Sequence, residues 1–264
     1  MTTRSKAATG LGILVVGLLA AAAFVLWPRD TTEISEQDAV ADFRSRDTSS
    51  TTAPDSPQRS VPEPGVYTYA AVGEEQVKLG PLPAETRPLP ASVTAVAVDA
   101  GEGCFDWTVN LFAEHTEDTR WCTDPVLQLD GHTKHQQIGV LSPTAIMVCN
   151  PNQMPDEASG PARSTELSCT FEMTGGPASI TATLAGNATI AEKTAIDIDG
   201  AQVAVTPINL HYAVTGDLTG TWDETTWWTT EHLPVRIERT LDLSGPATFS
   251  ETSKLQLISL TPAS

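Results

Sequence analysis

The fold is decided by residues 164–215, which read STELSCTFEMTGGPASITATLAGNATIAEKTAIDIDGAQVAVTPINLHYAVT. The dipeptides Gly175-Gly176, Gly186-Asn187 and Asp199-Gly200 separate short runs that are rich in strand-forming residues. Each dipeptide tolerates positive φ at both positions, as the two-residue loops of β-hairpins require. The stretch therefore predicts an antiparallel meander of short strands joined by tight turns.

Counting outward from Asp199-Gly200 predicts a register that places mostly apolar side chains opposite one another: Ile198 with Ala201, Ile196 with Val203 and Thr194 with Val205. Alternation of apolar and polar residues continues through 208–214 and 235–241. We expect about eleven strands in all, from first strands at 66–70 and 92–98 to a last one at 253–260. The predicted fold class is all-β, with one large curled antiparallel meander sheet of half-barrel or barrel-like form.

The N-terminal 28 residues predict a membrane anchor. Residues 7–28 contain no charged side chain, and a run of about twenty apolar residues can span a bilayer as a helix. Arg4 and Lys6 precede this run, so the positive-inside rule places residues 1–6 in the cytoplasm and the rest of the chain outside. The expected location is the plasma membrane, with a single pass. A cleaved signal peptide is the alternative, because Ala20–Ala23 offers small residues for cleavage.

Residues 29–64 predict an acidic linker rich in Ser, Thr and Pro, ahead of a β domain at 65–264. A short helix is expected over 35–46, with Ser35 as N-cap and Val40 and Phe43 on one face. So short a helix needs a surface to pack on. That surface is either a partner protein or the β domain itself.

The chain carries 33 acidic against 15 basic residues, a net charge of −18. Such an excess of negative charge argues against a nucleic-acid partner. It is also typical of a solvated surface that keeps a domain soluble.

The four cysteines predict disulfides. Their spacing, 18 residues from Cys104 to Cys122 and 20 from Cys149 to Cys169, suits neither a zinc ribbon nor a CxxC redox motif. An even number in an exported domain is typical of disulfide bonds. Of the three connectivities we favour Cys104–Cys122 and Cys149–Cys169, because each pair brackets an expected turn, at 115–118 and 155–161.

No catalytic, metal or cofactor motif is recognisable. His132 and His135 follow the hairpin dipeptide Asp130-Gly131 and lie three residues apart, on opposite faces of a strand, so they do not predict a metal site and are expected to be exposed. The sequence also lacks a GxSxG elbow, an HExxH motif and a phosphate-binding glycine loop. We therefore expect no enzyme, no cofactor and no bound metal.

The segment Thr226-Trp227-Trp228, the run Leu233-Pro234-Val235-Arg236-Ile237 and the ending Ser259-Leu260-Thr261-Pro262 resemble the C-terminal part of half-barrel envelope proteins related to the lipoprotein carrier LolA and the mycobacterial lipid carriers LppX and LprG. The chain also resembles uncharacterised actinobacterial membrane-anchored proteins in its opening at 64–69 and in Gly103-Cys104. The resemblance implies a curled sheet around a hydrophobic ligand. The chain differs from those carriers in its expected membrane-spanning anchor, which stands in place of a lipidated cysteine.

Two functions follow as hypotheses. In the first, the extracytoplasmic domain binds or senses a hydrophobic or lipid ligand on a concave face lined by aromatic residues, for which the candidates are Tyr67, Tyr69, Trp107, Trp222, Trp227 and Trp228. In the second, the domain is a structural or interaction module of the cell envelope that contacts a protein partner. The competing interpretation of these aromatic residues is that they simply fill the core of the domain.

Overall fold

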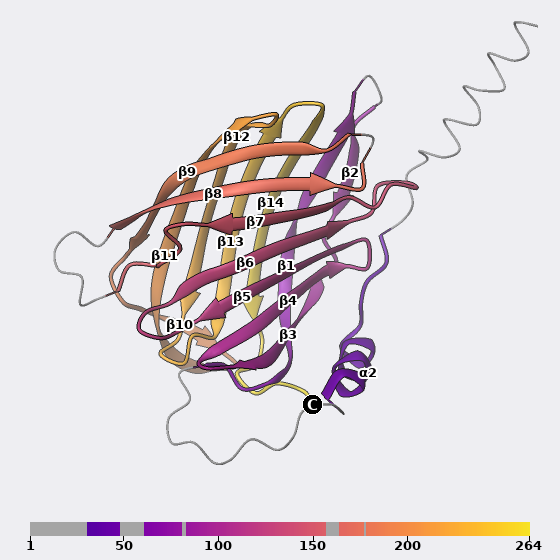
Figure 1. Cartoon of the computed structure of the whole chain (residues 1–264). Helices are drawn as coiled ribbons and strands as arrows, with labels where there is room; N and C mark the ends of the chain where they lie inside the picture. The colour runs from indigo at the N-terminus through magenta and orange to yellow at the C-terminus, as the bar shows by residue number, and fades with distance from the viewer. Residues whose placement is uncertain (1–30, 48–60, 81–82, 157–163, 177) are drawn as a thin grey trace, which may run out of the picture.

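The computed structural model describes residues 31–47, 61–80, 83–156, 164–176 and 178–264 (Figure 1). The predicted cytoplasmic N-terminus and membrane anchor, residues 1–28, lie outside these ranges. Of the helices in the described ranges, none combines the length and the apolar character needed to cross a membrane.

The described elements are one helix and fourteen strands, where we expected about eleven strands. They are α2 (Glu36–Asp47), β1 (Gly65–Leu79), β2 (Glu85–Pro88), β3 (Ser92–Gly101), β4 (Cys104–Phe112), β5 (His115–Cys122), β6 (Gln128–Gln136), β7 (Thr144–Cys149), β8 (Ser164–Thr174), β9 (Ile180–Ile190), β10 (Thr194–Ile198), β11 (Ala201–Gly216), β12 (Thr219–Trp228), β13 (Pro234–Ser244) and β14 (Ala247–Leu257).

The strands form one antiparallel sheet that closes into a barrel. Sheet order runs β11-β12-β13-β14-β1-β3-β4-β5-β6-β7-β8-β9, and β9 pairs with β11 to close a ring of 12 strands. β2 pairs with β1 beyond the part of β1 that β3 occupies, and β10 pairs only with β11. The predicted all-β class and curled antiparallel sheet are confirmed.

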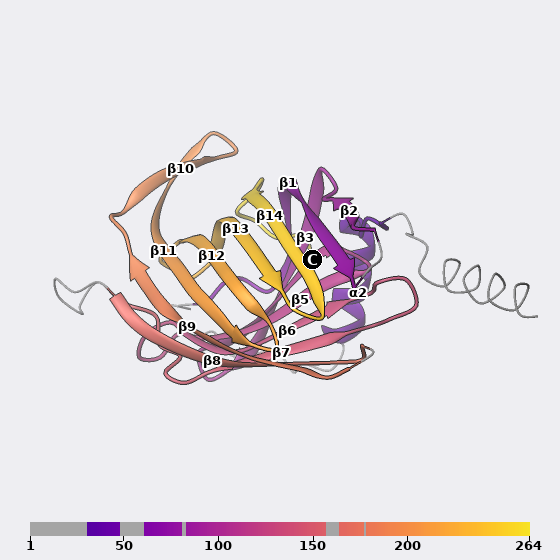
Figure 2. The same ribbon diagram turned by 90° about the horizontal axis from the view of Figure 1, so that it is seen from above.

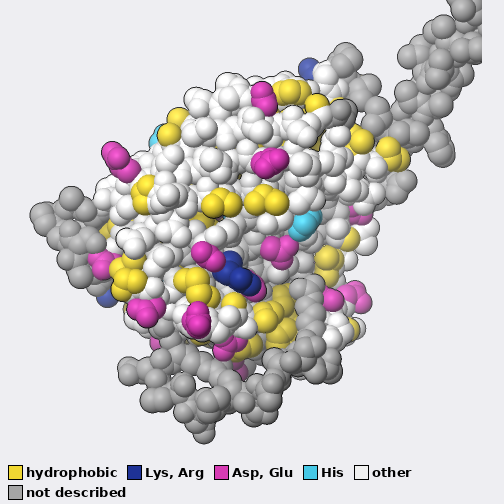
Figure 3. All heavy atoms as spheres, in the orientation of Figure 1, with side chains coloured by type: hydrophobic (Ala, Val, Ile, Leu, Met, Phe, Trp, Pro, Cys, Tyr) yellow, Lys and Arg dark blue, Asp and Glu magenta, His cyan; other side chains and the backbone are white. Residues whose placement is uncertain are grey.

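The barrel is flattened into two curved layers. Figures 1 and 2 show β4–β8 in one layer and β11–β14 in the other, with the β10–β11 hairpin extending beyond the ring. Acidic side chains are scattered over the face of the molecule seen in Figure 3, and basic ones are fewer there. The side chains that point inward from both layers form the core.

The Asp199-Gly200 turn and its register are confirmed. Both residues have positive φ, 51° and 80°, and Ile198 pairs with Ala201, Ile196 with Val203 and Thr194 with Val205. The chain also turns at Gly175-Gly176, but the connection from β8 to β9 runs over residues 175–179 and is longer than the two-residue loop expected. Local turn chemistry therefore accounts fully only for the β10–β11 hairpin.

The predicted loop at Gly186-Asn187 is wrong, because both residues lie in the middle of β9. Gly186 is opposite Tyr212 at the seam where β9 pairs with β11. A Cβ on Gly186 would lie 1.8 Å from the carbonyl oxygen of His211. This glycine permits close approach of two backbones and does not mark a turn.

Two further expected turns are also wrong. Asp130-Gly131 lies within β6, next to a register shift between Arg120 and Trp121 of β5. Residues 115–118 belong to β5, and the chain turns before them, between Phe112 and His115. An extra residue in a strand and a hairpin loop use the same turn-forming residues, so sequence does not separate them.

The helix expected over 35–46 is present as α2 and packs on the outside of the barrel. Ser35 caps it, since the Asp38 backbone N–H donates to Ser35 Oγ over 3.2 Å. Ala39 and Phe43 are buried against Val66 of β1 and Val96 of β3. The surface that this helix needed is therefore the chain's own β domain.

Candidate functional site

Inward-facing residues change character along the barrel axis, and β1 shows the change in one strand. Tyr67 and Tyr69 are buried and apolar, Glu75 is fully buried and charged, and Val77 lies beyond it. Alternation places all four on the inner face. The interior consequently has three levels, which we call the aromatic floor, the charged belt and the apolar cavity.

The aromatic floor consists of Tyr67, Tyr69, Trp107, Trp121 and Trp228, all buried. The rings of Tyr67 and Trp107 have centroids 5.5 Å apart, and those of Trp121 and Trp228 are 5.1 Å apart in an edge-to-face arrangement. The Tyr69 hydroxyl donates to the Pro234 carbonyl. Paired rings from both layers fill this end of the barrel.

The charged belt crosses the barrel at the middle level. It contains four carboxylates and four basic groups from seven strands: Glu75, Arg87, His115, Glu117, Lys134, Glu224, Arg239 and Glu251. Such groups are rarely buried unless they are paired. In this belt every member has at least one partner of opposite charge or a histidine.

Arg239 is the centre of the belt. Its guanidinium nitrogens lie 2.8 Å from Glu117, 2.8 Å from Glu224 and 3.3 Å from Glu251. Glu117 comes from β5 in one layer and Arg239 from β13 in the other. This ion pair therefore spans the inside of the barrel and holds the two layers at a fixed spacing.

Glu75 and Glu251 are direct partners in the β1–β14 ladder, and both are buried. Like charges opposite one another repel, so each needs its own cation. Arg87 pairs with Glu75, and Lys134 lies 3.5 Å from Glu251. The surrounding bases make this arrangement stable.

His115 is fully buried between two carboxylates. Its Nδ1 lies 2.6 Å from Glu75 and its Nε2 lies 3.2 Å from Glu117. Burial and Lys134 act to lower the pKa of His115, but the two carboxylates outweigh them and raise it. Through its contacts with both carboxylates, His115 takes part in the charge balance of the belt.

The pKa values of Glu117 and Glu75 are both lowered by neighbouring cations. Burial alone would raise the pKa of Glu117, but Arg239 and Lys134 outweigh it and keep that pKa well below its usual value. In the same way, burial is outweighed at Glu75, where His115, Lys134 and Arg87 lower the pKa. The belt is a set of charges that are already compensated within the protein.

Glu75, His115 and Glu251 place potential metal-ligating atoms within 4.8 Å of one another. The donor set does not suit a cation, however, because Arg87 and Lys134 already contact the two carboxylates. A divalent ion at this place would face those positive charges at short range. The same contacts show that the three residues serve the belt.

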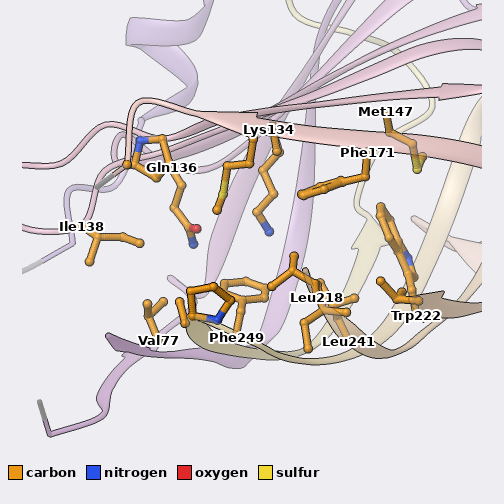
Figure 4. A pocket seen from close by; sticks show the side chains of 18 of the residues that line it. Val77, Lys134, Gln136, Ile138, Met147, Phe171, Leu218, Trp222, Leu241 and Phe249 are labelled. Carbon is orange, nitrogen blue, oxygen red and sulfur yellow. The ribbon is translucent and has the colours of Figure 1, made fainter. Parts of the chain in front are cut away.

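An apolar cavity of about 410 Å³ lies on the side of the belt away from the aromatic floor. Figure 4 shows Met147 and Phe171 on one wall and Trp222, Leu241 and Phe249 on the opposite wall. The volume falls within the range of about 300–1,000 Å³ that is usual for small-molecule sites. Lys134, Glu117 and Arg239 of the belt also line it.

Five chain turns surround the far end of the cavity. Gly80 follows β1, Leu141 lies between β6 and β7, Gly176 between β8 and β9, Leu218 between β11 and β12, and Pro246 between β13 and β14. Because neighbouring strands are antiparallel, these turns lie at one end of the barrel. Most of the surface that they and the strands present to the cavity is apolar.

Only one of the six predicted lining residues, Trp222, borders the cavity. Tyr67, Tyr69, Trp107 and Trp228 belong to the aromatic floor. Trp227 is partly buried and lies under the Arg236 guanidinium, 4.7 Å from the ring centroid. The prediction named Trp227 and Trp228 together, although neighbouring residues of a strand face opposite sides of the sheet, and it did not separate levels along the barrel.

The expected exposure of both histidines is wrong for His132. His135 is exposed, whereas His132 is buried, lines the cavity and lies 2.9 Å through Nδ1 from Thr119 Oγ1. Burial lowers the pKa of His132, with Glu117 opposing and Arg239 adding to the effect. Its imidazole is therefore neutral at neutral pH.

Both predicted disulfides are confirmed. Cys104 and Cys122 are directly opposite in the β4–β5 ladder, and Cys149 and Cys169 are opposite in the β7–β8 ladder. Each bond joins two neighbouring strands. The turn proposed at 155–161 lies partly outside the described residues.

The charged belt was missed by the sequence analysis. A signal existed in the run 235–241, because Arg239 falls on the same strand face as the apolar residues Val235, Ile237 and Leu241. A charge at an inward position of an amphipathic strand indicates a buried ion pair. The identity of its partners depends on the fold.

No protein-family model and no curated protein sequence matches this chain. Among solved structures, the chain is similar to the hypothetical lipoprotein YmcC from Escherichia coli K12, with 10% sequence identity and a TM-score of 0.34. The alignment covers 84% of this chain and 97% of that chain. At this TM-score the likeness carries no argument about function, and the resemblance to LolA-type carriers stays a prediction.

Proposed function

We propose that the barrel binds a hydrophobic or amphiphilic molecule in the apolar cavity. The observation that carries the proposal is that side chains fill one end of the barrel interior and leave a cavity at the other end. Paired rings fill the aromatic floor, whereas about 410 Å³ between Phe171 and Leu241 is left to a ligand. Apolar concavities with a few polar groups are the usual form of small-molecule sites.

We further propose that the protein acts by binding and not by catalysis. A general acid or base needs freedom to exchange a proton with a substrate. Glu117 and Lys134 line the cavity, but each is held in an ion pair with the belt. These charges support the barrel and close one end of the binding site.

Membrane attachment through residues 7–28 and an extracytoplasmic position of the barrel are part of the proposal. The disulfides Cys104–Cys122 and Cys149–Cys169 support an oxidising compartment. A barrel tethered in this way holds a ligand near the membrane without leaving it. The protein would then sense, store or present its ligand at one place.

An envelope interaction module is the alternative. Ile146 and Val148 favour it, because these two outward-facing residues of β7 are 50% and 52% exposed. Apolar residues that adjoin on a surface can mark a contact with another protein. The alternative requires no ligand in the cavity, so one experiment separates the two functions.

The experiment uses the full-length chain in lipid nanodiscs with an acyl-chain probe that carries a photoactivatable diazirine. We expect labelled peptides from β7, β8 and β12, whose side chains line the cavity. The variant Ala145→Phe fills the cavity and is expected to reduce this label to background. The control is Val148→Phe, on the same strand but pointing outward.

Label confined to residues 7–28 and to the outer surface would contradict the proposal. Equal labelling of β8 in Ala145→Phe and in the unchanged chain would do so too. Either result would favour the envelope interaction module.

A further inference from the structure

Two buried polar atoms on the cavity wall have no hydrogen-bond partner among the described residues. They are Nε1 of Trp222, on β12, and Nε2 of His132, on β6. Buried polar groups in proteins are almost always paired, so each exception requires an explanation. The residues that carry these two atoms come from opposite layers of the barrel, and both line the cavity.

The two side chains lie close together. The ring centroids of His132 and Trp222 are 5.7 Å apart, in an edge-to-face arrangement. Thr119 occupies Nδ1 of His132, which leaves only Nε2 for another partner. A polar group of a ligand at this level of the cavity is therefore the candidate partner for both nitrogens.

The chemistry of the two nitrogens selects an oxygen group. The indole N–H is a donor only, so it needs an acceptor oxygen. The neutral imidazole presents either a donor or an acceptor at Nε2, depending on the tautomer. A hydroxyl group satisfies both nitrogens, since it donates and accepts.

The charged belt disfavours an anionic group at this level of the cavity. Lys134, whose amine points into the cavity in Figure 4, is 3.4 Å from Glu117 and 3.5 Å from Glu251. Arg239 is paired with three carboxylates. An incoming carboxylate or phosphate would meet buried Glu117 on the cavity wall, and the two cations beside it are already paired.

We propose that the cavity accepts an amphiphile whose polar end is an uncharged oxygen group, and that Trp222 Nε1–H and His132 Nε2 bind this group. The inference rests on the proposed function and names its ligand class. A monoacylglycerol and a long-chain alcohol belong to this class, whereas a fatty-acid anion does not. The hydrocarbon chain lies among the apolar residues toward the five turns.

The test measures competition against the diazirine probe on the full-length chain in nanodiscs. The competitors are a monoacylglycerol, a fatty alcohol and a fatty acid of equal chain length, at a pH where the acid is ionised. We expect the monoacylglycerol to reduce labelling of β8 at about a tenfold lower concentration than the fatty acid does, because a hydroxyl can also donate a hydrogen bond and carries no charge to desolvate.

Trp222→Phe removes the N–H and keeps an aromatic ring in the cavity wall. It is expected to remove most of the advantage of the monoacylglycerol over the fatty acid. The matched control is Trp107→Phe, since the Trp107 Nε1 is also buried without a partner but lies in the aromatic floor. This control should keep the full preference.

Equal or stronger competition by the fatty acid overturns the inference, and so does an unchanged preference in Trp222→Phe, which would mean that water alone occupies the two nitrogens. In both cases the labelled cavity still supports the proposed function. If the cavity of the unchanged chain is not labelled, the result contradicts the proposed function and therefore also the proposed ligand class.

Discussion

The aromatic floor and the apolar cavity are built from the same strands, with the same alternation, yet one is filled and the other is hollow. In the floor, rings from opposite layers touch, as Trp121 and Trp228 do at 5.1 Å. In the cavity, the walls that carry Phe171 and Leu241 leave about 410 Å³ between them. The charged belt lies between the two regions, and its ion pairs set the spacing of the layers. Apolar inward residues alone therefore do not decide whether a barrel encloses a cavity.

Breaking the belt should have the largest effect on this difference. Arg239→Met removes the cation that Glu117, Glu224 and Glu251 share, and leaves buried carboxylates without their partner. We expect a loss of about 3–5 kcal/mol in the free energy of unfolding, measured by urea denaturation. The cavity should lose its fixed width, so labelling of β8 should fall as well.

Lys254→Met is the control for that change. Lys254 is paired with Glu238 over 3.0 Å, but its side chain is 47% exposed, so the expected loss is below about 1 kcal/mol. If the two variants lost the same stability, the belt would not be what separates the floor from the cavity.

Larger side chains should have an intermediate effect on the free energy of unfolding. This effect should be greater in the aromatic floor than in the apolar cavity. Ala95 is fully buried in the core, next to Tyr67 in the β-ladder, whereas Ala145 lines the cavity. Ala95→Leu overpacks a filled region and should cost about 1–3 kcal/mol in unfolding free energy. Ala145→Leu has free space beside it and should be near neutral.

Thermal or urea unfolding of both leucine variants checks this contrast. A cost for Ala145→Leu as large as that for Ala95→Leu would show that the cavity closes in solution. The comparison between the two regions would then not hold.

The smallest effect should come from pH, and it should act in opposite directions at the two buried histidines. The pKa of His115 is raised in the folded state, so protonation stabilises the fold below pH about 6.5 and this stability is lost as pH rises through the folded pKa. The pKa of His132 is lowered, so stability is full above pH about 6.5 and is lost as pH falls toward the folded pKa.

Unfolding free energies between pH 5 and about 8.5 separate the two contributions. His115→Gln should flatten the decline on the alkaline side, and His132→Gln should flatten the decline on the acid side. Parallel curves for both variants and the unchanged chain would mean that neither imidazole changes its pKa on folding.

Local features of the chain were predictable from the sequence. Asp199-Gly200 fixed a hairpin register because both residues tolerate positive φ. The disulfide pairs were also found, since Cys104 faces Cys122 and Cys149 faces Cys169 across neighbouring strands. In each case the partners lie no more than 20 residues apart. Contacts between residues that are close in the sequence can be predicted from a short stretch of chain.

The site was not predictable in the same way. The belt joins Glu75 to Glu251 and Glu117 to Arg239, from strands that are distant in the sequence and meet only in the closed barrel. Gly186 gave a false turn because a close approach between β9 and β11 requires glycine as a turn does. Of the predicted lining residues only Trp222 borders the cavity, because strand patterns carry no information on depth along the barrel.

The pairing of Glu75 with Glu251 has a consequence for the biosynthesis of this protein. A ribosome makes β1 before β14, so the nascent chain carries the carboxylate of Glu75 long before the strand that completes its surroundings exists. Neither the belt nor the closed cavity can form until β14 has been synthesised. A ligand bound in the cavity, as proposed, would therefore enter only after β14 has joined the sheet.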